Sequence, residues 1–468
     1  MSRSLRLSRE GVEKAGEKCK EYGKTQEYLA GASGTTRQTV IKFLKGQSVD
    51  RQIFLNICAS LDLNWGEVVE SDSEQESTDS VINRSKTLIA NTSKNSHFQA
   101  LIDDKTKDFV GREYVFQEIE DFLSRESKGY FIIEGTPGIG KSAILAKFVR
   151  KTNCITHFNI QGETDSFEQF LENISQQLID RYKLTKFSFL SEATRENKLS
   201  KLITEASKKL ASKERLVIVV DALDEVDESC RKKILNSPGY LPNNVYLIMT
   251  QRRGTESNFP PGLPLYKLDL TNDKYQQKSR EDVREYVGRA AATQQVSQWM
   301  INRAVTVEVF IETLVVKSEN NFMYLFYVLG DIKNNRYEDL SIENLPRGLE
   351  NYYKWHWDRM GMNAQPLPVI KINIIYIISV SKQAVSRQWI ANKLKESELT
   401  VQMVLKEWSQ FLRDSRLYSP PRYSFYHLSF QDFLYRNDII QAAGVDLKKL
   451  TGLIVDNYLE DFDNFEYE

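Results

Sequence analysis

The sequence has few cysteines and none lies close to another; they are Cys19, Cys58, Cys154 and Cys230. The absence of a CxxC pair excludes a cysteine-rich metal knuckle and is typical of a reducing compartment. The most apolar run, at residues 370–380, is interrupted by Lys371 and Asn373, whereas a helix that crosses a membrane needs about 20 apolar residues. The N-terminus lacks an apolar stretch of the signal-peptide type. We therefore expect a soluble, cytoplasmic chain without a membrane partner.

The sequence also has little net charge and no internal repeat of fixed period. The formal charge of −1 excludes an overall electrostatic bias toward nucleic acid or acidic substrates, so a charged partner must be recognised by a local patch. Apolar residues make up 41% of the chain, which is typical of globular proteins. The length of 468 residues predicts several domains, because one domain holds about 150 residues.

Apolar runs that predict strands alternate with amphipathic stretches that predict helices between about residues 105 and 270. The runs are YFIIE, ITHFNI, LVIVV and VYLIMT, and the helical stretches include FEQFLENISQQLIDRY and KLSKLITEASKKL. Unbroken Val/Ile/Leu runs are typical of strands that are covered on both faces, so we predict a parallel sheet between two layers of helices. Beyond this region the pattern is helical, with strand signals again only at 423–430.

The segment GTPGIGKS, at residues 135–142, follows a predicted strand and precedes a predicted helix. In this setting it matches the phosphate-binding loop G-x-x-x-x-G-K-[ST]. The glycines let backbone N–H groups point at phosphate oxygens, Lys141 reaches the β- and γ-phosphates, and the Ser142 hydroxyl binds Mg²⁺. The nucleotide-binding residues expected here are Gly135, Thr136, Pro137, Gly138, Ile139, Gly140, Lys141, Ser142 and Ala143.

A second predicted strand ends in acids, in the sequence LVIVVDALDEVDE. Asp221, at the end of this strand, is expected to hold Mg²⁺ together with Ser142. Asp224 and Glu225 are candidates for orienting or deprotonating the water that attacks the γ-phosphate; a solvated acidic turn is the alternative. Many ATPases have a carboxylate directly after the magnesium aspartate, but this chain has Ala222 there. We therefore expect slow hydrolysis.

The small residue after Asp221, with two acids just beyond it, resembles the pattern of NACHT ATPases. These belong, with the NB-ARC proteins, to the STAND class of switch NTPases. The segment FVGRE at 109–113 is similar to the one that packs on adenine and ribose in this family, which implies nucleotide contacts from Val110, Gly111 and Arg112.

Two later segments extend the resemblance. LIMTQRR, at 247–253, is similar to the sensor motif at a strand end, which implies that Arg252 lies near the γ-phosphate; Arg253 could take its place. FYHLSFQDFL resembles the end of the family's winged helix, which implies that His427 closes over the diphosphate of ADP. From the residues alone, the alternatives are a surface arginine for Arg252 and a packed structural histidine for His427.

The stretch GKTQEYLAGASGTTRQTVIKFLKG, at 23–46, resembles a Cro/repressor-type helix-turn-helix. Thr25 and Thr36 are predicted helix caps, Gly34 makes the turn, Ala30 allows the helices to cross, and Val40, Phe43 and Leu44 form the inward stripe. The residues predicted to face duplex DNA are Gln26, Arg37, Gln38, Thr39 and Lys42. Residues 1–51 hold eleven Lys and Arg against six Asp and Glu, which favours an anionic partner. A protein-docking adaptor remains the alternative.

Together these patterns predict a multidomain α/β protein in which a P-loop NTPase sheet is flanked by an N-terminal all-α helix-turn-helix domain and by C-terminal helical and winged-helix domains. The expected division is 1–70, helix-turn-helix domain; 71–104, linker; 105–268, NACHT-type P-loop NTPase core; 269–360, helical domain; 361–440, winged-helix domain; and 441–468, short C-terminal extension.

The resemblance implies an ATP switch that exchanges ADP for ATP with Mg²⁺, hydrolyses slowly and forms a homo-oligomer on activation. Its stimulus is not specified by the sequence and could arrive through a partner protein. Its role could be that of a transcription regulator or of an antiviral defence protein. The alternative function is a DNA-binding repressor in which the nucleotide domain serves only as an oligomerisation scaffold.

Overall fold

The structure is a computed structural model that describes residues 4–8, 11–12, 14–15, 18–19, 25–33, 35–61, 63, 68, 96–184, 192–336, 341–415 and 420–454. The chain divides into two compact units, Met1–Ala90 and Asn91–Glu468, and each is described by itself. Most of the expected linker, up to residue 95, lies outside the described residues, as does the predicted turn at Gly34.

The first unit contains β1 (Ser4–Leu5), α2 (Gln26–Ala32), α3 (Arg37–Leu44), β2 (Val49–Asp50) and α4 (Arg51–Ser60). The predicted caps are confirmed, because Thr25 Oγ1 accepts from Tyr28 N at 3.2 Å and Thr36 Oγ1 accepts from Thr39 N at 3.3 Å. Val40 and Phe43 are fully buried. The expectation of an all-α domain was wrong in one respect, since β1 and β2 pair antiparallel.

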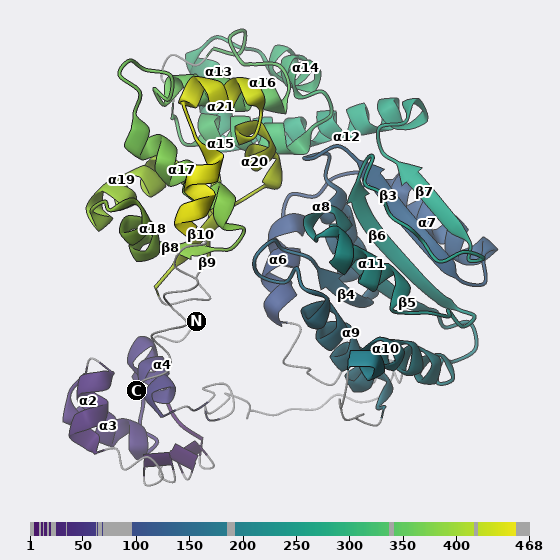
Figure 1. Cartoon of the computed structure of the whole chain (residues 1–468). Helices are drawn as coiled ribbons and strands as arrows, with labels where there is room; N and C mark the ends of the chain where they lie inside the picture. Colours follow the sequence, from purple (N-terminus) through teal and green to yellow (C-terminus); the bar gives the residue numbers. More distant parts are fainter. Residues whose placement is uncertain are drawn as a thin grey trace, which may run out of the picture. The chain divides into compact units, whose positions relative to one another are not determined.

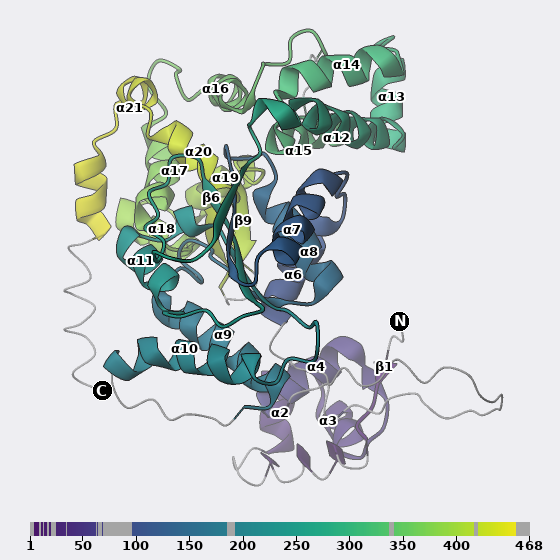
Figure 2. The ribbon, with the colours of Figure 1, turned by 90° about the vertical axis from the view of Figure 1, so that its right-hand side faces the viewer.

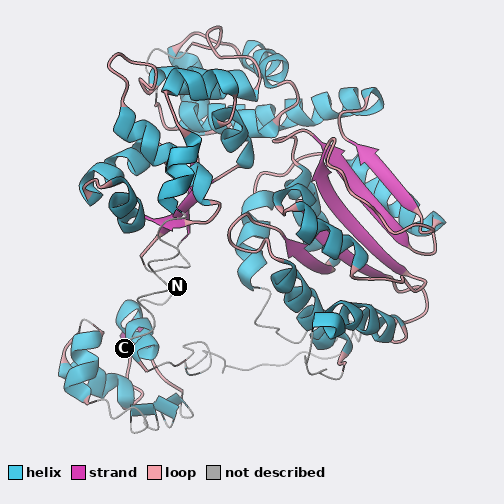
Figure 3. Ribbon diagram, in the orientation of Figure 1, coloured by secondary structure: helices cyan, strands magenta, loops and turns pink. Residues whose placement is uncertain are grey.

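The second unit is built on a five-stranded parallel sheet, which confirms the predicted parallel sheet (Figure 1, Figure 3). Its strands, in the order β4-β5-β6-β3-β7, are β3 (Gly129–Gly135), β4 (Ile155–Phe158), β5 (Leu216–Asp221), β6 (Val245–Arg252) and β7 (Leu265–Asp269). The strand β6 lies between β3 and β5, so the carboxyl ends of these three strands meet at one edge. The predicted phosphate and metal ligands of the core lie at this edge, either at the end of a strand or directly after it.

Helices cover both faces of this sheet. One layer consists of α6 (Ser96–Thr106), α7 (Glu113–Arg125) and α8 (Lys141–Thr152), and the other of α9 (Phe167–Tyr182), α10 (Glu192–Ser207) and α11 (Glu228–Asn236). Successive strand residues alternate between the two layers: Phe131 and Val219 join the first core, whereas Ile132 and Val220 join the second. This alternation explains why the strands are apolar at nearly every position.

The rest of the second unit is mostly helical (Figure 1, Figure 2). Its helices are α12 (Asp273–Ala291), α13 (Gln294–Asn302), α14 (Val307–Ser318), α15 (Phe322–Lys333), α16 (Leu349–Arg359), α17 (Val369–Ser381), α18 (Arg387–Leu394), α19 (Glu398–Glu407), α20 (Leu428–Leu434) and α21 (Asn437–Ala443). A small antiparallel sheet in the order β8-β10-β9 consists of β8 (Val385–Ser386), β9 (Leu412–Ser415) and β10 (Arg422–Phe425).

An aromatic core fixes α20 against this helical part. Phe430 of α20 stacks on Phe411 with ring centroids 4.5 Å apart, and it meets the edge of Tyr353 from α16 at 5.2 Å. The strand predicted over 423–430 was wrong in its second half, because β10 ends at Phe425 and α20 begins at Leu428. A helix forms there because Phe430 and Phe433, at helical spacing, share one buried face.

Helix α6 and strand β7 were not predicted. Residues 96–104 of the expected linker lie in α6, which packs on α8 and buries Phe98 and Ile102. The chain is therefore mixed α/β, with one five-stranded parallel sheet and extensive helical regions. None of the helices in the described ranges is both long and apolar enough to cross a membrane.

Candidate functional site

The glycine loop connects β3 to α8 and leaves the start of this helix open. Gly138 and Gly140 have φ angles of 81° and 102°, which favour glycine because a Cβ would be strained there. Gly140 is the N-cap residue of α8, and no side chain of the described chain caps this end. The first backbone N–H groups of α8 therefore stay available for an anion, as the helix dipole favours.

The helical part of the unit forms hydrogen bonds with the backbone of the glycine loop. Asn321, the N-cap residue of α15, donates from Nδ2 to Pro137 O at 2.8 Å, and Met323 N donates to Gly138 O at 3.1 Å. A Cβ on Gly138 would lie 2.5 Å from Asn321 Oδ1. Any side chain at Gly138 would therefore separate the loop from α15.

Lys141 is the first residue of α8, and its side chain folds back onto the start of the loop. Its Nζ donates to Gly135 O at 2.9 Å and to Thr136 O at 3.1 Å. Burial lowers the pKa of Lys141, and the negative charges of Asp224 and Asp221 oppose this effect. An ammonium group in this position can neutralise phosphate charge.

Asp221 ends β5 and is 3% exposed. The Thr250 hydroxyl donates to its Oδ1, a further hydrogen bond comes from Ser142, and Asn159 Nδ2 donates to its backbone oxygen at 2.7 Å. Burial raises the pKa of Asp221, and the hydrogen bonds from Thr250 and Ser142 oppose the rise.

The pair Asp221 and Ser142 fits Mg²⁺, which prefers oxygen ligands and keeps several waters. The described ranges contain no group of three or more His, Cys, Asp and Glu side chains that could hold a metal ion. Water and phosphate oxygens would therefore have to complete the coordination, as they do for Mg²⁺ bound with a nucleotide.

The chain turns sharply after β5 through Ala222, whose φ is 57° and whose N–H donates to Thr250 Oγ1 at 2.7 Å. The turn leads into the short 3-10 helix η1 (Leu223–Glu225). Asp224 is engaged by Arg252, which donates to it from its backbone N at 3.0 Å and from Nε at 2.8 Å. Burial, and then the charges of Asp224 and Asp221, raise the pKa of Glu225 to about 8. The two acids therefore have different environments.

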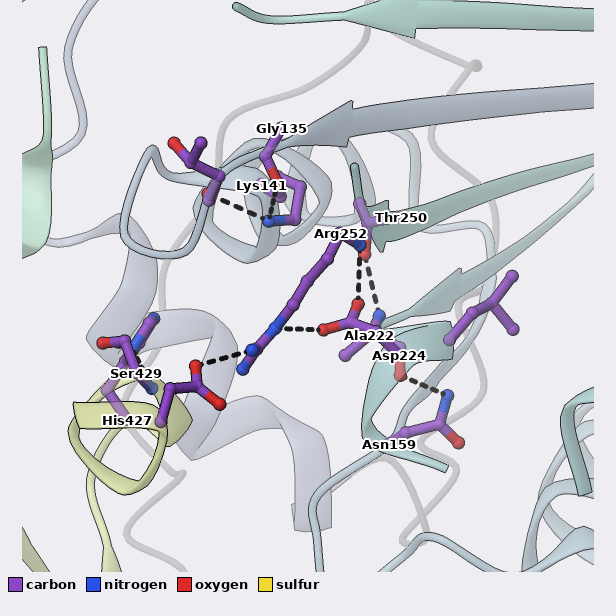
Figure 4. Close-up of polar contacts among 12 residues, drawn as sticks. Gly135, Lys141, Asn159, Ala222, Asp224, Thr250, Arg252, His427 and Ser429 are labelled. Carbon is purple, nitrogen blue, oxygen red and sulfur yellow. Dashed lines mark hydrogen bonds and ion pairs between the residues drawn. The ribbon is translucent and has the colours of Figure 1, made fainter. Parts of the chain in front are cut away.

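Arg252 is the last residue of β6, and its side chain points from the sheet toward the segment that carries His427 (Figure 4). Besides Asp224, it contacts Asp432 of α20, with 2.6 Å between Nη1 and Oδ2. Arg253 points elsewhere, since its side chain is 67% exposed and its nearest carboxylate partner is Asp269 at 3.5 Å. Of the two arginines, the structure places only Arg252 in the site.

His427 precedes α20 and caps it. Its Nδ1 accepts the backbone N–H of Ser429 at 3.2 Å and lies 2.6 Å from the Ser429 hydroxyl (Figure 4). Burial, and then the positive charges of Lys105 and Lys141, lower the pKa of His427 to about 3. The ring is therefore neutral at physiological pH, and because Nδ1 accepts, Nε2 carries the proton.

The segment before α7 has a structural role as well as a place at the site. The Arg112 guanidinium is buried and donates to Ile139 O at 2.8 Å, to the Tyr114 hydroxyl at 2.6 Å and to Ser279 Oγ at 3.1 Å. Gly111 has a φ of 59°, and a Cβ there would overlap with Asp282. Arg112 thus fastens the glycine loop to α12.

One cavity of about 320 Å³ brings most of these residues together. Among the predicted residues its lining includes Val110, Arg112, Pro137, Gly138, Ile139, Gly140, Lys141, Ser142, Ala143, Asp224, Glu225, Arg252 and His427. The predicted residues Gly111, Gly135 and Thr136 lie outside this lining, and Asp221 lines a smaller cavity beside it.

The cavity has an aromatic wall that consists of Phe109, Tyr286, Phe322, Phe326 and Tyr426. Sequence analysis pointed only to the segment of Phe109 and missed the other four. Phe326 and Tyr426 stack with centroids 5.2 Å apart and planes inclined by 7°. For Phe322, Phe326 and Tyr426 the only signal in the sequence was the density of aromatic residues in FMYLFY and SFYHLSF, and for Tyr286 there was none. Sequence analysis also missed Asp432 and the loop-holding Asn321.

The predicted DNA-facing residues belong to the first unit. Arg37, Gln38 and Lys42 are exposed, and Thr39 is half-buried. The Arg37 guanidinium pairs with Glu27 at 2.9 Å and donates to Gln26 Oε1 at 3.3 Å. Gln26 and Arg37 thus present one continuous polar surface.

The second unit has the defining parts of a P-loop NTPase: a glycine loop between strand and helix, a loop lysine, a hydroxyl and a strand-end aspartate. Residues 108–234 match the family model of the AAA ATPase domain. The chain thus carries an AAA-type ATPase domain, and this family implies binding of a nucleotide with Mg²⁺ and hydrolysis of NTP. A comparison with curated proteins found no match.

Several solved structures resemble the chain at low identity. A STAND protein with a tetratricopeptide repeat sensor from Pyrococcus horikoshii has 15% identity and a TM-score of 0.39, with 75% of this chain and 45% of that protein covered. Cdc6p from Pyrobaculum aerophilum has 10% identity and a TM-score of 0.31, with 79% and 96% covered. The RuvB Holliday junction branch migration motor from Thermotoga maritima has 13% identity and a TM-score of 0.28, with 72% and 99% covered. The chain thus spans less than half of the Pyrococcus protein.

Proposed function

We propose that the chain is a nucleotide-operated switch of the STAND class, similar to NACHT and NB-ARC proteins. It binds ADP or ATP with Mg²⁺, hydrolyses ATP slowly and assembles into a homo-oligomer when ATP replaces ADP. One observation carries this proposal: a single cavity is lined both by the glycine loop of the AAA domain and by α15 and the segment around His427. A nucleotide in this cavity would contact both parts of the unit at once.

The arrangement of charges gives each residue a role. Lys141 and the start of α8 neutralise the phosphates, Ser142 and Asp221 hold Mg²⁺, and the aromatic wall accepts the base. The bound ion supplies electrostatic stabilisation of the phosphate oxygens. Because Asp224 is paired with Arg252, Glu225 is the carboxylate that is left to orient or deprotonate the attacking water.

The closed form is the arrangement in which α20 is docked beside the core through Arg252 and Asp432. ADP and ATP differ in how they affect it. The Nε2–H group of His427 can donate to a phosphate of ADP, which stabilises the docking of α20. A γ-phosphate near Arg252 would compete for the guanidinium that Asp224 and Asp432 share. A ligand shifts a conformational equilibrium only by its difference in affinity for the two states, and these contacts supply such a difference.

The remaining parts of the proposal concern the domains and the output. We assign 105–268 to the NTPase core, 269–360 to a helical domain and 361–440 to a winged-helix domain, whose strands are β8, β9 and β10. Residues 1–70 form the helix-turn-helix output domain, which binds duplex DNA through Gln26, Arg37, Gln38, Thr39 and Lys42. The cellular role is that of a regulator or of an antiviral defence protein.

A second candidate function is a DNA-binding repressor in which the nucleotide domain is only a scaffold. The exposed Arg37, Gln38 and Lys42 on one face of α3 favour DNA binding in either case. The two functions differ in their dependence on nucleotide, because a scaffold would bind DNA equally well in every nucleotide state.

Light scattering of the full-length chain with ADP and with ATP-Mg²⁺, each with and without duplex DNA, tests the proposal. The switch predicts a higher mass with ATP than with ADP. A mass that is independent of nucleotide, together with DNA affinity that is independent of nucleotide, would favour the repressor. A chain that binds neither nucleotide would contradict both the switch and the site.

A further inference from the structure

A second cavity, of about 100 Å³, lies beside the nucleotide cavity. Ser142, Glu225 and His427 line both cavities, so the second one adjoins the phosphate end of the first. Asp221 lines the second cavity as well. Its volume lies well below the roughly 300 to 1,000 Å³ of pockets for drug-sized ligands. It therefore suits a small group and not a second nucleotide.

Three cationic side chains from outside the glycine loop and the strand ends line this second cavity. Lys105 comes from α6, Lys382 follows α17, and Arg413 comes from β9. The carboxylates in the lining are Asp221 and Glu225. Three positive charges against two negative charges leave an excess of one positive charge even when both acids are ionised. The cavity therefore favours an anion.

Arg413 differs from Arg252 in that its charge is not already neutralised. Arg252 forms ion pairs with two carboxylates, whereas Arg413 has no ion pair with any described residue. Its guanidinium is close enough to Glu225 to lower the pKa of that carboxyl, against the larger effect of burial. Its charge also lowers the pKa of His427. Arg413 is thus a half-buried arginine directed at the phosphate end of the site.

Asn159 also lines this cavity. Its side chain is 3% exposed, and its Nδ2 donates to the backbone oxygen of Asp221. Its Oδ1 is buried without a hydrogen-bond partner among the described residues. This oxygen is buried away from the cavity, so Asn159 serves here to hold the backbone of Asp221 through Nδ2. A phosphate group offers oxygens to the arginine and the lysines of the lining.

We propose that the second cavity binds one phosphate group, with Arg413 as the main cationic contact and Lys105 as the second. The group is either the terminal phosphate of bound ATP or orthophosphate that stays after hydrolysis. This inference rests on the proposed function, since the adjacent cavity is taken as the nucleotide site that supplies the phosphate. Arg413 belongs to the C-terminal part of the unit, so phosphate in this cavity would join that part to the core independently of ADP.

The test uses the full-length chain loaded with a fluorescent ADP analogue and measures ADP release with and without orthophosphate. Orthophosphate should slow the release from wild type, because it occupies the neighbouring cavity and holds β9 against the core. Arg413→Gln should remove this effect, which corresponds to at least a tenfold loss of orthophosphate affinity, since one charge-assisted contact contributes about that factor or more. Arg413→Lys should restore part of it. Arg422→Gln, in the neighbouring strand β10 at an exposed position, is the matched control and should behave as wild type.

A second measurement separates the two phosphate sources. If the γ-phosphate of ATP occupies the cavity, Arg413→Gln lowers the affinity for ATP and leaves that for ADP unchanged. If only orthophosphate does so, both nucleotide affinities stay unchanged while the orthophosphate effect is lost. Two results together would overturn the inference. One is a wild-type rate of ADP release that does not change with orthophosphate, and the other is an ATP to ADP affinity ratio that Arg413→Gln leaves unchanged. Failure of ADP binding in wild type would instead contradict the proposed function. Phosphate binding by the second cavity would then be tested by calorimetric titration of orthophosphate alone into wild type and Arg413→Gln.

Discussion

Arg252 donates from Nη1 to Asp432 Oδ2 over 2.6 Å and so joins the end of β6 to α20 across 180 residues of sequence. The other side of the same guanidinium contacts Asp224. Arg252 is therefore held between the core and the segment that carries His427. Neither residue of the contact is deeply buried, since the Arg252 side chain is 26% and that of Asp432 50% exposed.

Replacing Asp432 by Asn should weaken the docking of α20. An exposed ion pair contributes about 0.2 to 1 kcal/mol, so we expect ADP release to become up to about fivefold faster, with a larger assembled fraction. Release of a fluorescent ADP analogue and light scattering measure the two effects. Asp438→Asn removes a comparable surface ion pair with Arg436 and serves as the control. An Asp432→Asn protein with wild-type release and mass would show that this contact does not restrain the switch.

Replacing Lys141 by Ala should weaken both ADP and ATP binding. The ammonium lies in a partly dry site, where a hydrogen bond to a charged group contributes about 1.5 to 3 kcal/mol, so the affinity should fall by roughly ten- to a hundredfold. Calorimetry or fluorescence titration measures the change. Lys151→Ala, at the exposed end of α8, should leave the affinity as it is in wild type. Equal affinities of the Lys141→Ala and wild-type chains would remove Lys141 from the phosphate site.

The sheet was largely predictable, because strands that are buried on both faces require apolar side chains at successive positions. The run LVIVV became β5 and VYLIMT became most of β6. The edge strand β7 was missed because LYKLD exposes Leu265 and mixes polar with apolar residues. Helix α6 was missed because it directly follows a polar stretch and has a short apolar stripe.

The candidate site was predictable only where its chemistry is local in the sequence. Lys141 and Ser142 are adjacent, and Asp221 follows an obvious strand, so their types and spacing point to phosphate and Mg²⁺. Asp432 and Arg413 carry no local pattern, and the aromatic packing around Phe430 fixes α20 and the segment before β9 to each other within the helical part. Such contacts depend on tertiary structure and cannot be derived from spacing.

Hydrolysis should depend on Glu225 and on pH. Burial and the neighbouring carboxylates raise the pKa of Glu225 to about 8, and a general base must be deprotonated to act. The rate should therefore rise with pH, by about tenfold per unit well below the midpoint, and level off above it. Bound Mg²⁺ stabilises the ionised form and moves the midpoint to lower pH.

Glu225→Gln should abolish this pH dependence and most of the turnover while ATP affinity is retained. A phosphate-release assay from pH 6 to 9 compares it with wild type, and Glu228→Gln, on the exposed start of α11, is the control. Undiminished turnover in Glu225→Gln would assign the role of base to another group.

The first unit should bind duplex DNA through α3. Lysine and arginine that neutralise phosphates release counterions, so the affinity should fall with salt at a slope of about −0.9 per neutralised phosphate. Lys42→Ala should remove one phosphate contact and so reduce the magnitude of this slope by about 0.9, whereas Lys45→Ala, beyond the end of α3, should not change it. Gel-shift or anisotropy titrations at several salt concentrations measure the slope. Absence of binding to any duplex at low salt would favour the protein adaptor.

His427 offers the sharpest test of the switch, because its two ring nitrogens have separable roles. Nδ1 caps α20 by accepting the backbone N–H of Ser429, and Nε2–H is left to donate into the nucleotide cavity. His427→Asn keeps a good N-cap and removes the Nε2 donor, whereas His427→Ala removes both. If His427 has only this structural role, the His427→Asn variant should behave like wild type in every assay.

A hydrogen bond from His427 Nε2 to a phosphate of ADP predicts that His427→Asn keeps the melting temperature close to wild type. The variant should release ADP roughly ten- to a hundredfold faster, since a hydrogen bond to a charged group contributes about 1.5 to 3 kcal/mol. His427→Ala should show the same fast release and also lose about 1 kcal/mol of stability through the missing cap. Differential scanning calorimetry and ADP release, measured on the same preparations, separate the two effects. If His427→Asn releases ADP at the wild-type rate while His427→Ala is only less stable, His427 acts as a helix cap and the contact that holds the closed form must come from Arg252 and Asp432.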